Sequence, residues 1–359
     1  MRGISATFIA IAVFITCTNG TAQANEEITL RQAIQAYGQE DYSSAYEQML
    51  DYLPLGSADA AHYLGFLSID GHGTEYDPVA AMAYFQAAKE WGHPDSAEYI
   101  AQIEPHLSAE ELAAAAQQVA QLQNQLVVPH SDARFELNER EAPERLRAVS
   151  PRYPEGKLKQ GQMPWMNLAQ VIGPNGKIIH ATRMSSAPND IFAAYRRVQW
   201  RWRFAESEGI SVRFVQVAFI MAMSIVGERE TYQKSFNEVY PLALAGLPEH
   251  QMFLANLARQ TDQNGEYFDF MEGIERISFL ERSARGGYIH AQRSMALRYR
   301  RDVWAEYLIN KGDLTTATLY GAMLYAHAAD PKQVQRGAEL IRTAAAAGYK
   351  NAQALLEFL

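Results

Sequence analysis

Few residues of this chain have the type and spacing that catalysis or metal binding requires. Its single cysteine, Cys17, directly follows an N-terminal apolar run. His72 and His93 are the histidines that suggest a metal site, but no cysteine or tight carboxylate cluster accompanies them, as zinc sites need. The sequence has no G-x-S-x-G, no H-E-x-x-H, no P-loop and no dinucleotide-binding glycine motif after an expected strand. We therefore expect no catalytic residues, no cofactor and no metal.

The clearest charge pattern is a basic cluster within an acidic chain. The formal net charge of the 359 residues is −9, which argues against nucleic acid as a partner. Four arginines nevertheless lie close together in sequence: Arg196, Arg197, Arg201 and Arg203. Two interpretations stay open at this point. The arginines form either a solvated helix face or a contact site for an acidic partner or lipid headgroups.

These arginines belong to a segment, 151–221, that predicts a small α+β unit. Asn175-Gly176 is a strong hairpin signal because both central residues of such a turn need positive φ. It separates expected strands at 163–172 and 177–184. Apolar residues at i, i+4 and i+7 predict a helix from Ile191 to Val198. A last strand is expected from Val212 to Met221, which completes the order strand, strand, helix, strand.

Alternation along these strands predicts which side chains share a face. On the last strand Val215, Val217 and Phe219 should lie under the helix, with Val212, Phe214 and Gln216 on the other face. The first strand alternates poorly, so that Asn167 or Gln170 points inward in one register or the other. Three tryptophans of this segment are expected to pack under the helix, the alternative being an aromatic ligand cage: Trp165, Trp200 and Trp202.

The segments on either side predict helices that recur with a fixed phrase. Gly56 and Gly92 lie 36 residues apart, and each is followed four residues later by a small residue. A period of this size is typical of helical solenoids. Near the C-terminus the phrase Ala-Ala-x-x-Gly-x-x-x-Ala-Gln recurs in part at Gly287 and in full at Gly348, with a degenerate instance at Gly246. Glycine is expected there because helix C-termini favour a left-handed residue.

Two family resemblances follow from these motifs. Residues 60–100, with Tyr63-Leu64-Gly65, Gly71-x-Gly73, Ala80-Ala81, Ala87-Ala88 and Gly92-His93, resemble a Sel1-like repeat, a relative of the tetratricopeptide repeat that mediates protein contacts. The motifs of 151–224 resemble the C-terminal domain of TonB: Tyr153-Pro154, Gly161, Asn175-Gly176, Ser185-Ser186, Phe192 and Trp202-Arg203-Phe204. The resemblances imply a multidomain chain, with all-α helical-repeat arrays (Sel1/TPR-like) at 25–126 and 225–359. These arrays flank a small α+β (ββαβ) TonB C-terminal-like domain, reached through a connector at 127–150.

The N-terminus predicts an address in the cell envelope. Arg2, a short apolar run and the Ala22-Gln23-Ala24 site have the pattern of a secretory signal cleaved after Ala24. The mature chain would then be periplasmic and would lack cysteine. The alternative is a lipoprotein acylated at Cys17. No later segment has the length and apolar character of a membrane span.

The sequence therefore predicts a periplasmic interaction or scaffold protein, not an enzyme. Its partners are expected to be periplasmic or membrane-associated proteins bound through the repeats and the TonB-like domain. In the TonB family a partner peptide adds to the sheet edge, which here implies Val212, Phe214 and Gln216. The alternative is that a neighbouring helix of the second array closes this edge. Two alternatives remain: a TonB-type energy transducer for outer-membrane transport, and an envelope enzyme with an unrecognised site. The partner's identity, the oligomeric state and the process served do not follow from the residues.

Overall fold

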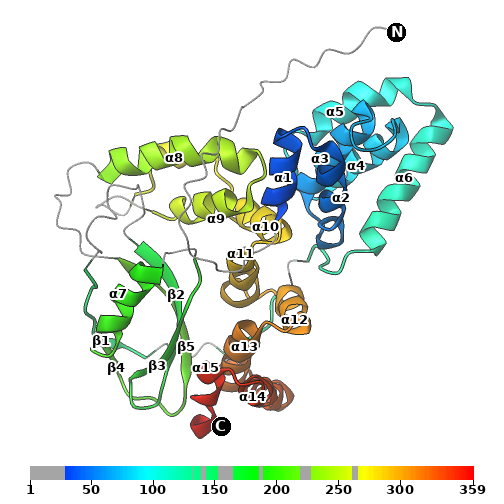
Figure 1. Ribbon diagram of the computed structural model, residues 1–359. Helices are drawn as coiled ribbons and strands as arrows, with labels where there is room; N and C mark the ends of the chain where they lie inside the picture. Colours follow the sequence, from blue (N-terminus) through cyan, green and yellow to red (C-terminus); the bar gives the residue numbers. More distant parts are fainter. Residues whose placement is uncertain are drawn as a thin grey trace.

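A computed structural model of the chain describes residues 29–131, 133–138, 143–152, 165–185, 189–218, 228–260 and 266–359. The expected signal peptide 1–24 lies outside the described residues, as do Tyr153, Pro154, Gly161 and Phe219. The described part is mostly helical with a small β-sheet region, as the sequence predicted. Figure 1 shows helices on both sides of the sheet in sequence, running from blue and cyan to yellow and red.

The first helices pack mainly on their neighbours in the chain. They are α1 (Leu30–Gly38), α2 (Tyr42–Leu50), α3 (Ala58–Asp70), α4 (Pro78–Glu90), α5 (Ser96–Ile103) and α6 (Ala109–Asn124). The exception is α6, which packs against α4. Their ends follow local sequence. Asp77 caps α4 by accepting hydrogen bonds from the backbone of Val79 and Ala80, and Pro78 is its first residue. Ser108 and Glu111 form the capping box that starts α6.

The sheet region contains one main sheet and a short strand pair. The strands are β1 (Arg145–Arg147), β2 (Trp165–Ile172), β3 (Ile178–Arg183), β4 (Arg203–Phe204) and β5 (Ser211–Ala218), with α7 (Asn189–Gln199) between β3 and β4. All pairings are antiparallel, and the main sheet has the order β3-β2-β5. β1 pairs with β4. This short pair lies outside the strand order that the sequence predicted.

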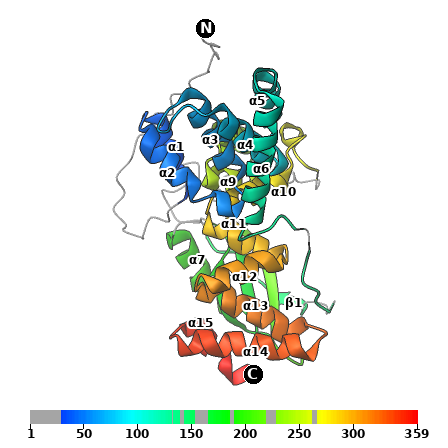
Figure 2. The same cartoon turned by 90° about the vertical axis from the view of Figure 1, so that its right-hand side faces the viewer.

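The remaining helices are α8 (Glu228–Leu244), α9 (Pro248–Leu257), α10 (Arg276–Arg285), α11 (Ile289–Arg293), α12 (Asp302–Asn310), α13 (Leu314–His327), α14 (Pro331–Ala346) and α15 (Lys350–Gln353). Most of them, from α10 to α14, descend as a column that passes beside the sheet (Figure 2), whereas α8 lies above the sheet in the view of Figure 1. A π-helical turn, Ser294–Arg298, follows α11 directly.

The recurring glycine phrase has a recurring geometry. Gly56, Gly92, Gly246, Gly287 and Gly348 all have φ between 71° and 94°, and each lies between the end of one helix and the start of the next. In three of these places the glutamine five residues after the glycine donates to the carbonyl three residues before it. These bonds are Gln251 to Ala243 at 3.2 Å, Gln292 to Ala284 at 3.0 Å and Gln353 to Ala345 at 3.3 Å. The same side-chain bond thus fixes the same corner three times.

Both faces of the main sheet are covered. On one face Met166, Leu168 and Val217 pack with Ile191 and Tyr195 of α7. The opposite face belongs to the large core shared by the helices on both sides of the sheet, through Ala169, Val171, Val212 and Phe214, and α13 contacts β5 there. The sheet is therefore a layer between α7 and the second helical column, where the sequence suggested a separate unit.

The connector at 127–150 is docked along the helices where the structure describes it. The backbone N–H of Val127 donates to Pro54, that of Phe135 to Arg300 and that of Asn138 to His327. Phe135 is buried, and its ring meets that of Tyr320 edge to face at 5.0 Å. The described part of the connector therefore contacts the helices of both groups.

Candidate functional site: an open sheet edge and an arginine pocket

Strand β5 has an outer edge, and the pairing of β5 with β2 determines which of its N–H and C=O groups point toward that edge. The N–H of Asn167 donates to the Ser185 hydroxyl at 3.3 Å, and its carbonyl accepts from Met184 at 2.9 Å. Both groups of Asn167 therefore point toward β3. Directly opposed residues in an antiparallel pair exchange either both bonds or none. Asn167 is paired with Gln216, so the N–H and C=O of Gln216 point away from β2, toward the outer edge.

The same parity holds along the strand. Phe214 pairs with Ala169 and Val212 with Val171, so their backbone groups also face outward. Among the described residues, no group hydrogen bonds to the outward N–H or C=O of these three β5 residues. The side chain of Gln216 is exposed, whereas those of Val212 and Phe214 are half-buried against the helices. Such an edge can template another strand, and its most accessible end is at Gln216.

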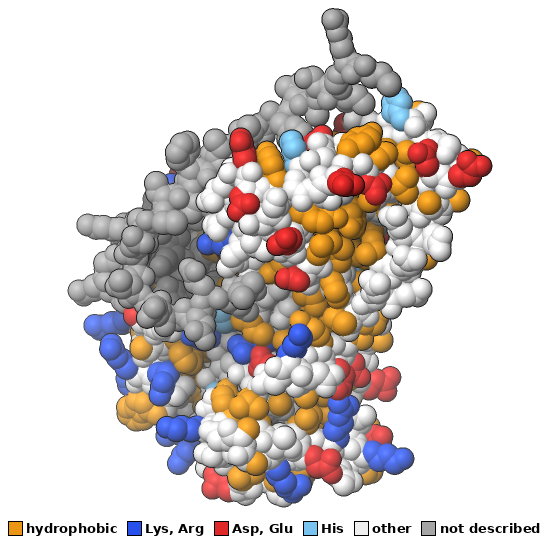
Figure 3. Space-filling model, turned by 45° about the vertical axis from the view of Figure 1, so that its right-hand side comes forward, with side chains coloured by type: hydrophobic (Ala, Val, Ile, Leu, Met, Phe, Trp, Pro, Cys, Tyr) orange, Lys and Arg blue, Asp and Glu red, His pale blue; other side chains and the backbone are white. Residues whose placement is uncertain are grey.

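The four clustered arginines lie at the end of α7 and in the following turn. Arg196, Arg197 and Arg201 are exposed. Arg203 is half-buried and donates to the carbonyls of Trp200 and Trp202 at 2.6 and 2.7 Å. In Figure 3 Lys and Arg side chains gather at the lower left, on the part of the molecule that contains the sheet. Both interpretations of the cluster are compatible with this placement, because cations at a helix C-terminus are favourable in any case.

One expectation for this region is wrong. Trp200 does not pack under α7: it is 68% exposed. The helix ends at Gln199, so the next side chain no longer follows the helical register. Trp202 is buried as expected, meets Tyr195 at 6.0 Å and donates its indole N–H to Val149. Trp165 lies in β2, and its side chain is outside the described part of the structure.

A second group of arginines forms a pocket that the sequence did not indicate. Arg259 follows α9, Arg276 begins α10 and Arg298 ends the π-helical turn. Together with four other polar residues, they line a cavity of about 10 Å³, room for about one water molecule. The four are Asn167 of β2, Asn256, Ser294 and Tyr299. The three arginines are 17 and 22 residues apart in sequence, so no local motif connects them.

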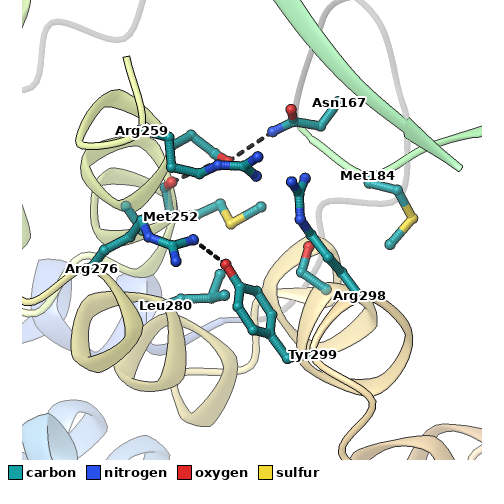
Figure 4. A pocket seen from close by; sticks show the side chains of 11 residues that line it. Asn167, Met184, Met252, Arg259, Arg276, Leu280, Arg298 and Tyr299 are labelled. Carbon is teal, nitrogen blue, oxygen red and sulfur yellow. Dashed lines mark hydrogen bonds between the residues drawn. The ribbon is translucent and has the colours of Figure 1, made fainter. Parts of the chain in front are cut away.

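The three arginine side chains of the pocket have few hydrogen-bond or ion-pair partners among the described residues. Arg276 donates to the hydroxyl of Tyr299. No described residue hydrogen bonds or pairs with the side chains of Arg259 and Arg298, and Figure 4 shows their guanidinium groups pointing toward one another. Burial, together with the charges of Arg259 and Arg276, lowers the pKa of Arg298 to about 10. Burial also lowers the pKa of Arg259, and the nearby charge of Arg276 acts in the same direction.

The amide groups beside these arginines are only partly satisfied. Asn167 donates from Nδ2 to Oδ1 of Asn256 at 2.7 Å, and Asn256 donates in turn to the carbonyl of Met252. The Oδ1 atom of Asn167 is buried and receives no hydrogen bond from the described residues. A buried acceptor without a donor is costly, and it often indicates a water or ligand that completes the site.

The two histidines of the sequence analysis are placed apart. His72 is exposed and stacks on Tyr42 at 4.4 Å. His93 is buried and stacks on His62 at 3.7 Å, with its Nε2 atom 3.9 Å from Asp59. Burial lowers the pKa of His62 to about 2 and that of His93 to about 4. Both rings are therefore neutral near pH 7 and form part of a packed core.

Within the described ranges, no helix is both long and apolar enough to cross a bilayer. Within the same ranges, His, Asp and Glu side chains do not gather in threes as a metal site would require. A scan against protein-family models finds no match, and no curated protein matches the chain significantly.

Proposed function

We propose that this chain is a protein-binding scaffold of the periplasm, with Sel1-like helical repeats on both sides of a TonB C-terminal-like domain. The repeated glycine corners and their glutamine bonds support the repeat assignment, because one local geometry recurs at three places with one sequence phrase. The β3-β2-β5 order with α7 on one face supports the TonB-like assignment. The N-terminal signal pattern supports the address.

The observation that carries the binding role is the outward-facing backbone of β5. Three alternate residues, Val212, Phe214 and Gln216, present N–H and C=O groups that the described residues leave without a partner. Because α7 and α13 pack on the two faces of the strand, the edge is already positioned before a partner arrives. An extended segment of a partner protein would add as a fourth strand beside β5, and preorganisation would lower the entropic cost of binding.

The test uses two substitutions at one position. Gln216→Pro removes the outward N–H and leaves the pairing of β5 with β2 intact, because that N–H does not bond to β2. Gln216→Ala removes the side chain and keeps the N–H. After cross-linking and pull-down from the periplasm, a partner held by the parent and by Gln216→Ala should be lost with Gln216→Pro, with an unchanged circular dichroism spectrum. A partner retained by a folded Gln216→Pro variant would exclude the β5 edge.

The TonB-type transducer remains the second candidate, but the connector works against it. A transducer needs a long free spacer between its anchor and its binding domain, whereas residues 127–131 and 133–138 are hydrogen bonded to the helices at Pro54, Arg300 and His327. N-terminal sequencing separates the two candidates. A native chain that begins at Asn25 supports the scaffold, and a chain that retains its N-terminal segment supports the transducer.

A further inference from the structure

The pocket formed by Arg259, Arg276 and Arg298 has the chemistry of an anion site. Three guanidinium groups from three separate elements meet there, and none of the described residues that line the pocket carries a carboxylate. Like charges that are half-buried together repel one another, and burial strengthens the repulsion because it lowers the local dielectric. Arg276 is also the first residue of α10, where the helix dipole adds positive potential. An anion between the three guanidinium groups would offset their mutual repulsion and would be attracted by the N-terminus of α10.

The local backbone is unusual at the same place. Arg298 ends the π-helical turn Ser294–Arg298, in which the N–H of Tyr299 reaches the carbonyl of Ser294 at 3.1 Å. Arg300, two residues later, has a φ of 57°. Single π-turns are rare in proteins, and those that occur are often found at functional sites. A non-glycine residue at positive φ is also uncommon. This backbone brings Arg298 to the side of α11 that faces Arg259 and Asn167 (Figure 4).

We propose that this pocket binds a phosphate-type oxyanion held by Arg259, Arg276 and Arg298. Arginine forks match phosphate oxygens in pairs, and a dianion neutralises three cations better than a single carboxylate does. Asn167 supplies an acceptor for a protonated phosphate oxygen through its free Oδ1 atom. The cavity of about 10 Å³ is smaller than phosphate. Entry of the anion therefore requires the side chains of Arg259 and Arg298 to move apart, and neither has a hydrogen-bond partner among the described residues to release.

The test measures inorganic phosphate binding to the full mature chain by titration calorimetry and by the melting temperature. Sodium chloride and sodium acetate at equal ionic strength are the comparison salts. Phosphate should raise the melting temperature where the other two salts do not. Arg298→Gln should weaken phosphate binding about tenfold or more, since it removes one charged fork. Arg342→Gln is the matched control because it removes the same charge from an exposed position in α14, and it should bind like the parent.

The behaviour of the variants without phosphate separates a ligand site from a structural cluster. Arg298→Gln should melt at or above the parent temperature in chloride, because it relieves repulsion between unpaired cations. A lower melting temperature would show that Arg298 is structural and would overturn the proposal. Arg298→Lys keeps the charge without the fork, so it should fold normally and recover only part of the phosphate affinity.

Three further outcomes would also overturn the proposal of a phosphate site. Phosphate without any effect on the parent would exclude the site. Acetate acting as strongly as phosphate would make the ligand a carboxylate. Asp262, in the 261–265 segment outside the described residues, is the nearest acid after Arg259 in sequence. If Asp262→Asn lowered the melting temperature in chloride and created phosphate binding that the parent lacks, the arginines would pair with the chain's own carboxylate.

Discussion

The carboxylate of Asp59 and the guanidinium of Arg282 form a buried ion pair that joins α3 to α10, 223 residues away in sequence. Arg282 donates from Nε to Oδ2 at 3.2 Å, and Gln251 donates to the same oxygen at 3.0 Å. Burial alone would raise the pKa of Asp59. The charge and hydrogen bonds of Arg282 outweigh burial and hold the pKa below its usual range. The two helical groups are thus linked by charge as well as by apolar contact.

Breaking this pair from one side should destabilise the whole chain. Asp59→Asn leaves Arg282 buried without its counter-charge, which we expect to cost about 3–5 kcal/mol in urea-induced unfolding. Replacing both members, as Asp59→Leu with Arg282→Met, should cost much less because no unpaired charge remains. If the Asp59→Asn variant were as stable as the doubly substituted protein, the ion pair would contribute little to the junction between α3 and α10.

The stacked histidines should make stability fall as the medium becomes acidic. Burial lowers the pKa of His93 from 6.5 to about 4 and that of His62 to about 2, so the unfolded chain binds protons that the folded chain does not. Their contribution is fully present above pH 6.5 and is lost as pH falls from 6.5 toward 4. The expected slope is about 1.4 kcal/mol per pH unit for each histidine.

Urea unfolding between pH 7 and pH 4 tests this slope. His93→Gln should flatten it by the share of one histidine. His106→Gln, at an exposed position, should leave the slope unchanged. An identical slope in the parent and in His93→Gln would contradict the assignment of the pH dependence to this core.

The glycine corners should be costly for any other residue. At Gly92, φ is 94° and an added Cβ would meet no atom within 4 Å, so the penalty of Gly92→Ala comes from the backbone alone, about 1 kcal/mol. Gly38→Ala is the control: it lies in α1, also in open space but without positive φ. It should be neutral or slightly stabilising. Thermal melts that rank the two substitutions in the opposite order would contradict the left-handed corner.

Docking of the connector predicts that a residue outside any regular element matters for stability. Phe135→Ala removes a buried ring that packs on Tyr320, and we expect a loss of about 3 kcal/mol. Leu146→Ala, at a side chain that is 63% exposed, should change stability by less than about 0.5 kcal/mol. Limited proteolysis should cut the Phe135→Ala variant faster within 127–150. Equal cutting of both variants would mean that the connector is not held by this ring.

Local signals predicted local structure well. Asp77, Ser108 and the recurring glycines mark helix ends because caps and left-handed corners depend on a few neighbouring residues. The placement of Val217 under α7 and of Phe214 on the other face follows from strict alternation along β5. These features need no knowledge of the distant chain.

Features that depend on distant contacts were missed or misjudged. Asn167 and Gln170 lie on opposite faces of β2, so only one of them could be buried if a single face of the sheet were covered. Both are buried because helices cover both faces. Asn167 bonds to Asn256, and Gln170 donates to the Tyr195 hydroxyl at 2.8 Å. The pocket arginines were missed for the same reason, since a turn between α11 and α12 and the ends of two other helices bring them together.

The doubly covered sheet has a consequence for any attempt to shorten the chain. A fragment holding only the strands and α7 would keep the packing of Tyr195 but would lose the helical cover over Ala169, Val171 and Phe214. That apolar face would then lie in water beside an unpaired strand edge, a combination that promotes self-association. The excised fragment should therefore aggregate, and studies of this segment are best made on the intact protein.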